Sequence, residues 1–192
     1  MLAFCQLAFS EVQYIKYMKK KTQKKLSLLV AAVALATYNI FTPDAKVKSN
    51  DIDCYVAVVS VSDGDTFRGV SEDGTETRFR MQGIDAPETG QAFAKRSKAK
   101  LSSLILGKRV GIRVHKKKDG FGRPVVWVET PNGLDAGEEM LKSGMAWHFK
   151  NYDNAENYNK LEQEARNNRV GLWKDSNPTA PWEYRKSKRY KE

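Results

Sequence analysis

Short runs of β-branched and aromatic residues, separated by turn signals, fill much of the middle of the chain. They predict five strands, over 54–61, 66–70, 75–84, 108–114 and 124–129. Asp63-Gly64 marks a turn after the first run, and Glu72-Asp73-Gly74 is typical of a hairpin turn after the second. This part of the chain is therefore expected to form a small sheet or barrel.

The apolar spacing becomes helical between the third and fourth predicted strands. A helix is predicted over 91–106, where lysine and arginine side chains separate the apolar positions. Gly107 follows this segment as a stop signal.

Two further helices are predicted after the last strand. Asp135 is suited to cap one that runs through Ser143, and Asp153 with Glu156 resembles a capping pair for one that continues to about Asn168. Five short strands with about three helices indicate an α+β protein. A closed five-stranded barrel of the oligonucleotide-binding (OB) type is the architecture that fits this order.

The charge of the chain is concentrated at its two ends. The 192 residues carry a formal net charge of +10, yet residues 1–50 hold eight lysines against two acidic residues, and the last twelve residues contribute +3. We therefore divide the chain into a folded domain over 51–180 and a basic C-terminal tail over 181–192. The hydrophobic content of 41% excludes wholesale disorder, and the two cysteines are too few for a disulfide framework.

The N-terminal region has the pattern of an export signal. Lysines cluster over 19–25, and the apolar run Leu26–Ala36 that follows is shorter than the roughly 17–25 residues needed to cross a bilayer. We interpret 1–41 as a signal peptide or N-terminal membrane anchor and 42–50 as a linker; Met18 would begin a more ordinary leader than Met1. The expected location is periplasmic, secreted or membrane-anchored, and a buried core helix is the alternative.

Two acidic turns flank the third predicted strand, which itself contains Arg80. The first is Asp63-Gly64-Asp65-Thr66 and the second is Asp85-Ala86-Pro87-Glu88. Carboxylates at such turns suit a hard cation such as Ca²⁺, which takes oxygen ligands. Each motif alone is also an ordinary turn sequence.

An arginine also follows a glycine-rich turn, in Asp119-Gly120-Phe121-Gly122-Arg123. A guanidinium offers paired donors that fit a phosphate, although a solvated hairpin tip has the same sequence features. Two loop carboxylates, a nearby glutamate and two arginines together are the groups that phosphodiester hydrolysis requires.

Six segments in order resemble the staphylococcal nuclease (thermonuclease) family, especially its exported bacterial branch. They are VSVSDGDTFRG, RFRMQGIDAPE, DGFGRPVVWV, SGMAWHFKNY, EARNNRVGLW and PWEYRK. The resemblance covers roughly 52–185 and implies an OB barrel with three helices and a Ca²⁺-dependent nuclease site on its surface. It also implies endo- and exonucleolytic cleavage of DNA and RNA that leaves 3′-phosphates.

The resemblance further implies roles for single residues. Asp65 and Asp85 would bind one Ca²⁺ through their carboxylates, and Ala86 through its backbone carbonyl. The other implied roles are a general base at Glu88 and two arginines that grip the scissile phosphate, Arg80 and Arg123. The chain departs from the family where Ala86 and Phe121 replace the Thr and Tyr that relatives often have.

Aromatic residues over 145–152 correspond loosely to the base-stacking region of that family. Trp147, Phe149 or Tyr152 could stack on a base, and core packing is the alternative for at least one of them. His148 and His115 are expected at the surface.

Three other aromatic and sulfur-containing residues are assigned to packing. Cys54 is expected as a small buried residue, and Trp173 and Trp182 are expected to pack the last helix and the tail.

Two other functions are left open by the sequence. One is a catalytically inactive OB module that binds nucleic acid or protein, and the other is an interaction protein whose basic leader binds anionic lipid. For the nuclease, whose substrates would be DNA and RNA, we expect a monomer with no obligate protein partner.

Overall fold

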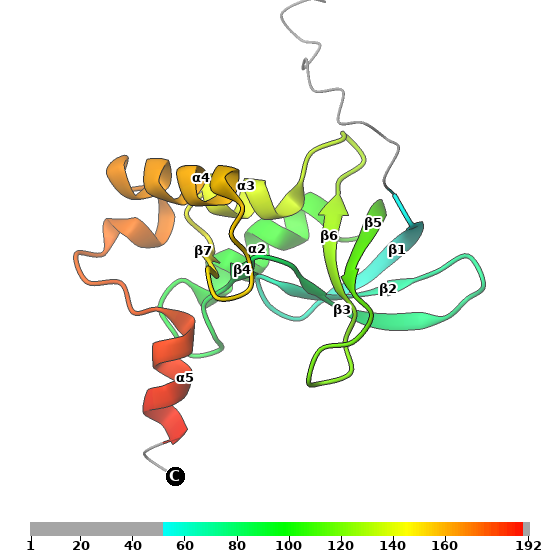
Figure 1. Ribbon diagram of the computed structural model, residues 1–192, viewed down its shortest axis with the longest axis horizontal. Coiled ribbons are helices and arrows are strands. Elements are labelled where there is room, and N and C mark those ends of the chain that lie inside the picture. The colour runs from blue at the N-terminus through cyan, green and yellow to red at the C-terminus, as the bar shows by residue number, and fades with distance from the viewer. Residues whose placement is uncertain (1–51, 190–192) are drawn as a thin grey trace, which may run out of the picture. The chain divides into compact units, whose positions relative to one another are not determined.

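Five strands close into a barrel in the order β1-β2-β3-β6-β5 (Figure 1). In this computed structural model, which describes residues 52–189, the barrel strands are β1 (Cys54–Val61), β2 (Thr66–Val70), β3 (Glu76–Met81), β5 (Arg109–Lys116) and β6 (Val125–Glu129). The predicted leader over 1–41 and linker over 42–50 lie outside the described residues. The predicted α+β class and OB-type barrel are confirmed.

Alternation along the strands directs one face of each strand into the barrel. Val56 and Val58 of β1 are buried while their sequence neighbours are exposed, as a half-buried strand requires. Neighbouring strands pair antiparallel except β3 and β6, which run parallel with Arg80 opposite Val125. Phe67 and Phe79 stack inside the barrel, with ring centroids 5.2 Å apart.

The third predicted strand is divided into two. It was expected over 75–84, but β3 ends at Met81 and β4 (Ile84–Asp85) pairs instead with β7 (Trp147–His148). Gly83 lies between them with a φ of 74°, a left-handed conformation that glycine adopts without steric cost. This bend gives Asp85 a position outside the barrel ladder.

Four α-helices and a 3₁₀ helix (Gly171–Lys174) accompany the barrel in the described part of the chain. The α-helices are α2 (Ala94–Ile105), α3 (Ala136–Lys142), α4 (Glu156–Asn167) and α5 (Pro181–Arg189). In Figure 1, α2, α3 and α4 lie on one side of the barrel, and α5, drawn in red, lies apart from them. The sequence predicted about three helices and only a basic tail where α5 is found.

The predicted helix caps have different outcomes. Asp135 caps α3, and its side chain accepts a hydrogen bond from the Glu138 backbone N–H at 3.0 Å, as predicted. The capping pair predicted for α4 is wrong, because the N-cap is Ala155. Asp153 instead accepts from the Ala155 backbone N–H at 3.2 Å, two residues before the N-cap.

Two groups of buried side chains stabilise this arrangement. The larger group fills the barrel and contacts α2 and α3, and the smaller one surrounds Trp147 and Trp173, with Trp182 of α5 packed against it. The packing roles predicted for Trp173 and Trp182 are confirmed. None of the helices within 52–189 has the length and hydropathy needed to cross a membrane.

Two of the expected burial states are wrong. Cys54 is exposed, because it is the first residue of β1 and lies at the open end of the face that Val56 and Val58 bury. His148 is buried between β4 and α4, where its backbone N–H donates to Glu162 at 3.2 Å, whereas His115 is exposed as expected.

Candidate active site

Arg80 brings together two carboxylates from different elements. Its NH1 contacts Asp65 Oδ1, and its NH2 donates to Asp85 Oδ1 at 2.9 Å and to the Ile84 carbonyl at 3.0 Å. The pairing of Thr66 with Arg80 across β2 and β3 places Asp65 beside the arginine, and the bend at Gly83 brings Asp85 back to it. Three of the predicted site residues therefore lie in direct contact.

The turn that carries Asp65 is held from several sides. Asp65 Oδ2 accepts from the Ala86 backbone N–H at 2.6 Å, and Oδ1 accepts from the Thr66 hydroxyl at 3.0 Å. Asp63 accepts from the Asp65 backbone N–H at 3.1 Å, so it supports the turn. These bonds fix the orientation of the Asp65 carboxylate.

Gly64 allows this turn to approach α2. A Cβ atom at Gly64 would lie 1.8 Å from Ser97 Oγ and 2.7 Å from the Ala86 Cβ, distances that no side chain tolerates. Ser97 itself is fixed by a hydrogen bond from its hydroxyl to the Met145 carbonyl, 2.6 Å long. Close contact with α2 therefore requires glycine at this position.

Both carboxylates are removed from solvent. Asp85 is 1% exposed and Asp65 is 5% exposed, so their charges need partners. Burial lowers the pKa of the Arg80 guanidinium; the Asp85 and Asp63 carboxylates oppose this shift, and the charge of Arg123 adds to it. Arg80 nevertheless stays protonated, as guanidinium groups in proteins do, and it compensates the buried negative charge.

A residue that sequence reasoning did not include completes the cluster. Arg185 of α5 donates from NH1 to Glu88 Oε1 at 2.5 Å and to Asp85 Oδ1 at 3.2 Å, and from NH2 to Asp85 Oδ2 at 2.8 Å. These hydrogen bonds raise the pKa of Arg185 above its ordinary value, and those to Asp85 contribute most. In the sequence, the only indication of this role is that Arg185 belongs to PWEYRK, one of the segments that resemble the family. The prediction instead counts Arg185 among the charges of a basic tail.

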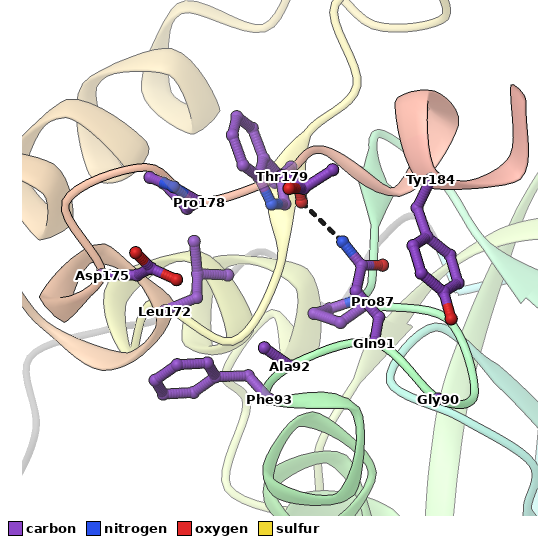
Figure 2. A pocket seen from close by; sticks show the side chains of 11 residues that line it. Pro87, Gly90, Gln91, Ala92, Phe93, Leu172, Asp175, Pro178, Thr179 and Tyr184 are labelled. Carbon is purple, nitrogen blue, oxygen red and sulfur yellow. Dashed lines mark hydrogen bonds between the residues drawn. The ribbon is translucent and has the colours of Figure 1, made fainter. Parts of the chain in front are cut away.

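Gln91 connects the Glu88 loop to the segment that leads into α5. Its Oε1 accepts from the Glu88 backbone N–H at 3.0 Å, and its Nε2 donates to the Thr179 carbonyl at 2.5 Å (Figure 2). A cavity of about 190 Å³ lies between these segments, and Figure 2 shows Tyr184 of α5 beside Gly90 at one end of it. Sequence reasoning missed Gln91 as well.

Arg123 is held by the loop between β5 and β6. Its Nε and NH2 donate to Asp119 Oδ2 at 2.9 and 2.8 Å, and its NH1 donates to the Thr66 hydroxyl at 3.4 Å. Because that hydroxyl also donates to Asp65, a short hydrogen-bonded chain joins Arg123 to the carboxylate cluster. The structure thus places Arg123 at the same site as the other predicted residues.

Asp119 is a carboxylate with a lowered pKa. Burial alone would raise its pKa, but hydrogen bonds from the backbone and side chain of Arg123 and from the Phe121 backbone lower it. The ionised form of Asp119 is therefore the one that holds Arg123 in place.

The three aromatic residues proposed for base stacking have different environments. Trp147 is 8% exposed and packs against Trp173, with ring centroids 4.5 Å apart, so the structure assigns it the packing role. Phe149 stacks on Trp182 at 5.4 Å with the rings inclined by 16°. Tyr152 is 70% exposed, and its ring remains accessible for a base.

The carboxylate cluster suits a hard cation. Its donors are oxygens, and within the contacts described above the three carboxylates of Asp65, Asp85 and Glu88 exceed the guanidiniums of Arg80 and Arg185 by one negative charge. No group of three His, Cys, Asp or Glu side chains in residues 52–189 has metal-holding geometry by itself. A cation here would therefore need water, carbonyl or substrate oxygens as further ligands, which is ordinary for Ca²⁺.

Comparison with known proteins relates most of this region to one family. The family model described as "Staphylococcal nuclease homologue" matches residues 78–175, which include Arg80, Asp85, Glu88 and Arg123. Asp65 and Arg185 lie outside the matched range.

Relatives occur in bacteria and plants. Proteins named as uncharacterized endonucleases are 37% identical over 134 residues in Haemophilus influenzae and 35% identical over 136 residues in Escherichia coli O157:H7. These matches cover 69% and 71% of this chain and 73% and 88% of the relatives. A staphylococcal-like nuclease of Arabidopsis thaliana is 43% identical over 112 residues, which are 58% of this chain and 34% of that protein. The matched region thus spans between about a fifth and a third of the length of the plant relatives.

Proposed function

Because the chain belongs to the staphylococcal nuclease family, we propose that it hydrolyses phosphodiester bonds of DNA and RNA in a Ca²⁺-dependent reaction. The reaction is proposed to be endo- and exonucleolytic and to leave 3′-phosphates. The observation that carries the proposal is the contact of Arg80 with both Asp65 and Asp85. Burial of two carboxylates carries a desolvation penalty, and a binding module without catalysis would not need to bear it.

Asp65 and Asp85 are proposed to hold the cation, with the Ala86 carbonyl as a further ligand. The Ala86 backbone N–H is already bonded to Asp65, and this bond fixes the peptide next to the carboxylate. When bound, Ca²⁺ would supply charge neutralisation at the phosphate and would acidify the attacking water. The side chains supply the remaining steps.

Arg123 and Arg80 are proposed to stabilise the negative charge that builds up on the phosphate. Asp119 and Thr66 orient the Arg123 guanidinium before substrate binds, so little reorganisation is needed during the reaction. Removal of one such preorganised donor typically costs about 10²–10³ in rate.

Glu88 is proposed to take the proton from the attacking water. It is on a loop at the surface of the cluster, and the Gln91 side chain holds its backbone N–H. In the present arrangement one of its oxygens accepts from Arg185, so proton transfer requires the other oxygen or the release of that bond.

Export is part of the proposal and depends on the N-terminal pattern alone. A basic cluster followed by the apolar run Leu26–Ala36 supports a signal peptide or membrane anchor and a place in the exported bacterial branch of the family. Millimolar Ca²⁺ sites are usable outside the cytoplasm, which is consistent with this location.

The proposal is tested by digestion of DNA and RNA with the purified chain in Ca²⁺, in Mg²⁺ and in EDTA. Cleavage in Ca²⁺ that EDTA abolishes supports it, and end-labelling identifies the 3′-phosphates. Binding of oligonucleotides without cleavage under any divalent cation would instead indicate an inactive OB module.

A further inference from the structure

The C-terminal helix α5 is attached to the site by few contacts. Within Pro181–Arg189 only Pro181 is buried, and Trp182 packs on Trp147 and Phe149 with ring centroids 5.5 and 5.4 Å away. The helix has nine residues, and helices shorter than about 12–15 residues are marginal alone in water. Its position therefore depends to a large extent on the ion pairs that Arg185 forms.

Arg185 covers the oxygens of Asp85. The carboxylate of Asp85 offers about four lone-pair positions; Arg80 NH2 and Arg185 NH1 use Oδ1, and Arg185 NH2 uses Oδ2. Three donors therefore fill both positions of Oδ1 and one of Oδ2. A cation that binds Oδ1, or both oxygens, takes a position that an arginine now uses, so one of the two arginines then has to yield.

Arg185 is the arginine that can yield. Arg80 is also bonded to Asp65 and to the Ile84 carbonyl, and it belongs to a barrel strand. The Arg185 side chain is 36% exposed and belongs to the weakly attached α5. Water can replace its hydrogen bonds at lower cost than those of Arg80, because solvent already screens the charge of a partly exposed guanidinium and weakens its ion pairs.

We infer that Arg185 is a positioning residue that acts through Asp85 and Glu88, and that it competes with the cation for Asp85. In the absence of the cation, Arg185 pairs with both carboxylates and holds them in place. When Asp85 binds the cation, Arg185 leaves that carboxylate and Glu88 is freed to accept a proton. This inference depends on the proposed function, because it assumes that the cation binds at Asp85.

The competition works in both directions. If docking of α5 weakens cation binding by some factor, then cation binding must weaken docking of α5 by the same factor. The cation would thus loosen a helix that carries the exposed side chains of Lys186, Lys188 and Arg189.

The test measures Ca²⁺ affinity of the full chain by titration calorimetry, without substrate. Arg185→Gln removes the charge, and Lys186→Gln is the matched control, because it removes the same charge from an exposed position on the same helix. We expect Arg185→Gln to bind Ca²⁺ at least about fivefold more tightly than the wild type, Lys186→Gln to differ less than twofold, and Arg185→Lys to lie between the wild type and Arg185→Gln. Circular dichroism verifies that each variant is folded.

Hydrogen exchange of the wild type provides a second readout that does not depend on activity. Amides of α5 should exchange faster with Ca²⁺ than without it, while amides of β1 should not change. Equal or weaker Ca²⁺ binding by Arg185→Gln, or greater protection of α5 with Ca²⁺, overturns the inference.

These results remain distinguishable from failure of the proposed function. Ca²⁺-dependent cleavage by the wild type, together with unchanged Ca²⁺ affinity in Arg185→Gln, rejects the role of Arg185 alone. Absence of Ca²⁺ binding and of cleavage in both proteins rejects the inference and the proposed function together.

Discussion

The Asp119 carboxylate binds both the side chain and the backbone N–H of Arg123. One carboxylate oxygen accepts from Arg123 Nε and NH2 at 2.9 and 2.8 Å, and the other accepts from the Arg123 backbone N–H at 2.9 Å. Five residues of a loop are thereby closed around one guanidinium, which the Thr66 hydroxyl connects to Asp65. The orientation of Arg123 is a property of this loop and does not require substrate.

Replacement of Asp119 by Ala should therefore lower nuclease activity without unfolding the protein. The guanidinium of Arg123 would lose its orienting partner, and misplacement of a positioned group by about 1 Å can cost roughly 10²-fold in rate. We expect kcat/KM for DNA cleavage to fall about 10- to 100-fold. Glu76→Ala, which breaks the exposed pair with Arg68, is the control and should leave kcat/KM unchanged.

The same residue should give a pH-dependent contribution to stability. Because the folded-state pKa of Asp119 is lowered below its ordinary value of 3.8, its contribution is fully present above that value. It is lost as the pH falls through the folded-state pKa. The difference in unfolding free energy between wild type and Asp119→Asn should be constant from about pH 5 to 7 and should shrink below about pH 4. A difference that grows on acidification would contradict this assignment.

A methyl group at Gly64 should disturb the Asp65 turn. The added Cβ would meet Ser97 Oγ and the Ala86 Cβ, both of which belong to packed segments. We expect Gly64→Ala to lower the unfolding free energy by about 1–3 kcal/mol, measured by chemical denaturation. Gly120→Ala is the matched control, because no atom lies within 4 Å of the Cβ it would add; equal effects of the two substitutions would exclude the steric explanation.

Tyr152 and Trp147 should respond differently to replacement by Ala. Loss of the exposed Tyr152 ring should weaken binding of a single-stranded oligonucleotide by about 1–3 kcal/mol and leave stability nearly unchanged. Loss of the buried Trp147 ring should lower the unfolding free energy by about 3–5 kcal/mol. Fluorescence anisotropy and denaturation measure the two effects, and unaltered oligonucleotide binding by Tyr152→Ala would remove Tyr152 from the binding surface.

The barrel was predictable because its information is local. Strand alternation and the turn at Asp63-Gly64 identify β1 and β2, and the Asp-Gly-Asp and Asp-Ala-Pro-Glu motifs identify the carboxylates at the ends of strands. Adjacent antiparallel strands then bring Asp65 to Arg80 without any long-range information. The predicted third strand ran too far because the pairing of β4 with β7 depends on residues more than sixty positions later.

The parts of the site that could not be predicted depend on contacts between distant segments. Arg185 lies a hundred residues after Asp85. The spacing of apolar and polar residues in a basic helix of nine residues does not indicate which arginine faces a carboxylate. Gln91 reaches Thr179 over 88 positions for the same reason. The burial of His148 follows from the packing of α4 over β7 and leaves no mark in its neighbouring residues.

The central claim is that Asp85 holds the cation on which phosphodiester cleavage depends. It is tested most directly by the rate of single-stranded DNA cleavage by Asp85→Asn at saturating Ca²⁺, with Glu72→Gln as the control for an exposed acidic residue. We predict a fall of at least about 10²-fold for Asp85→Asn, in a protein that retains its circular dichroism spectrum, and no change for Glu72→Gln. Cleavage by folded Asp85→Asn at the wild-type rate would contradict the account.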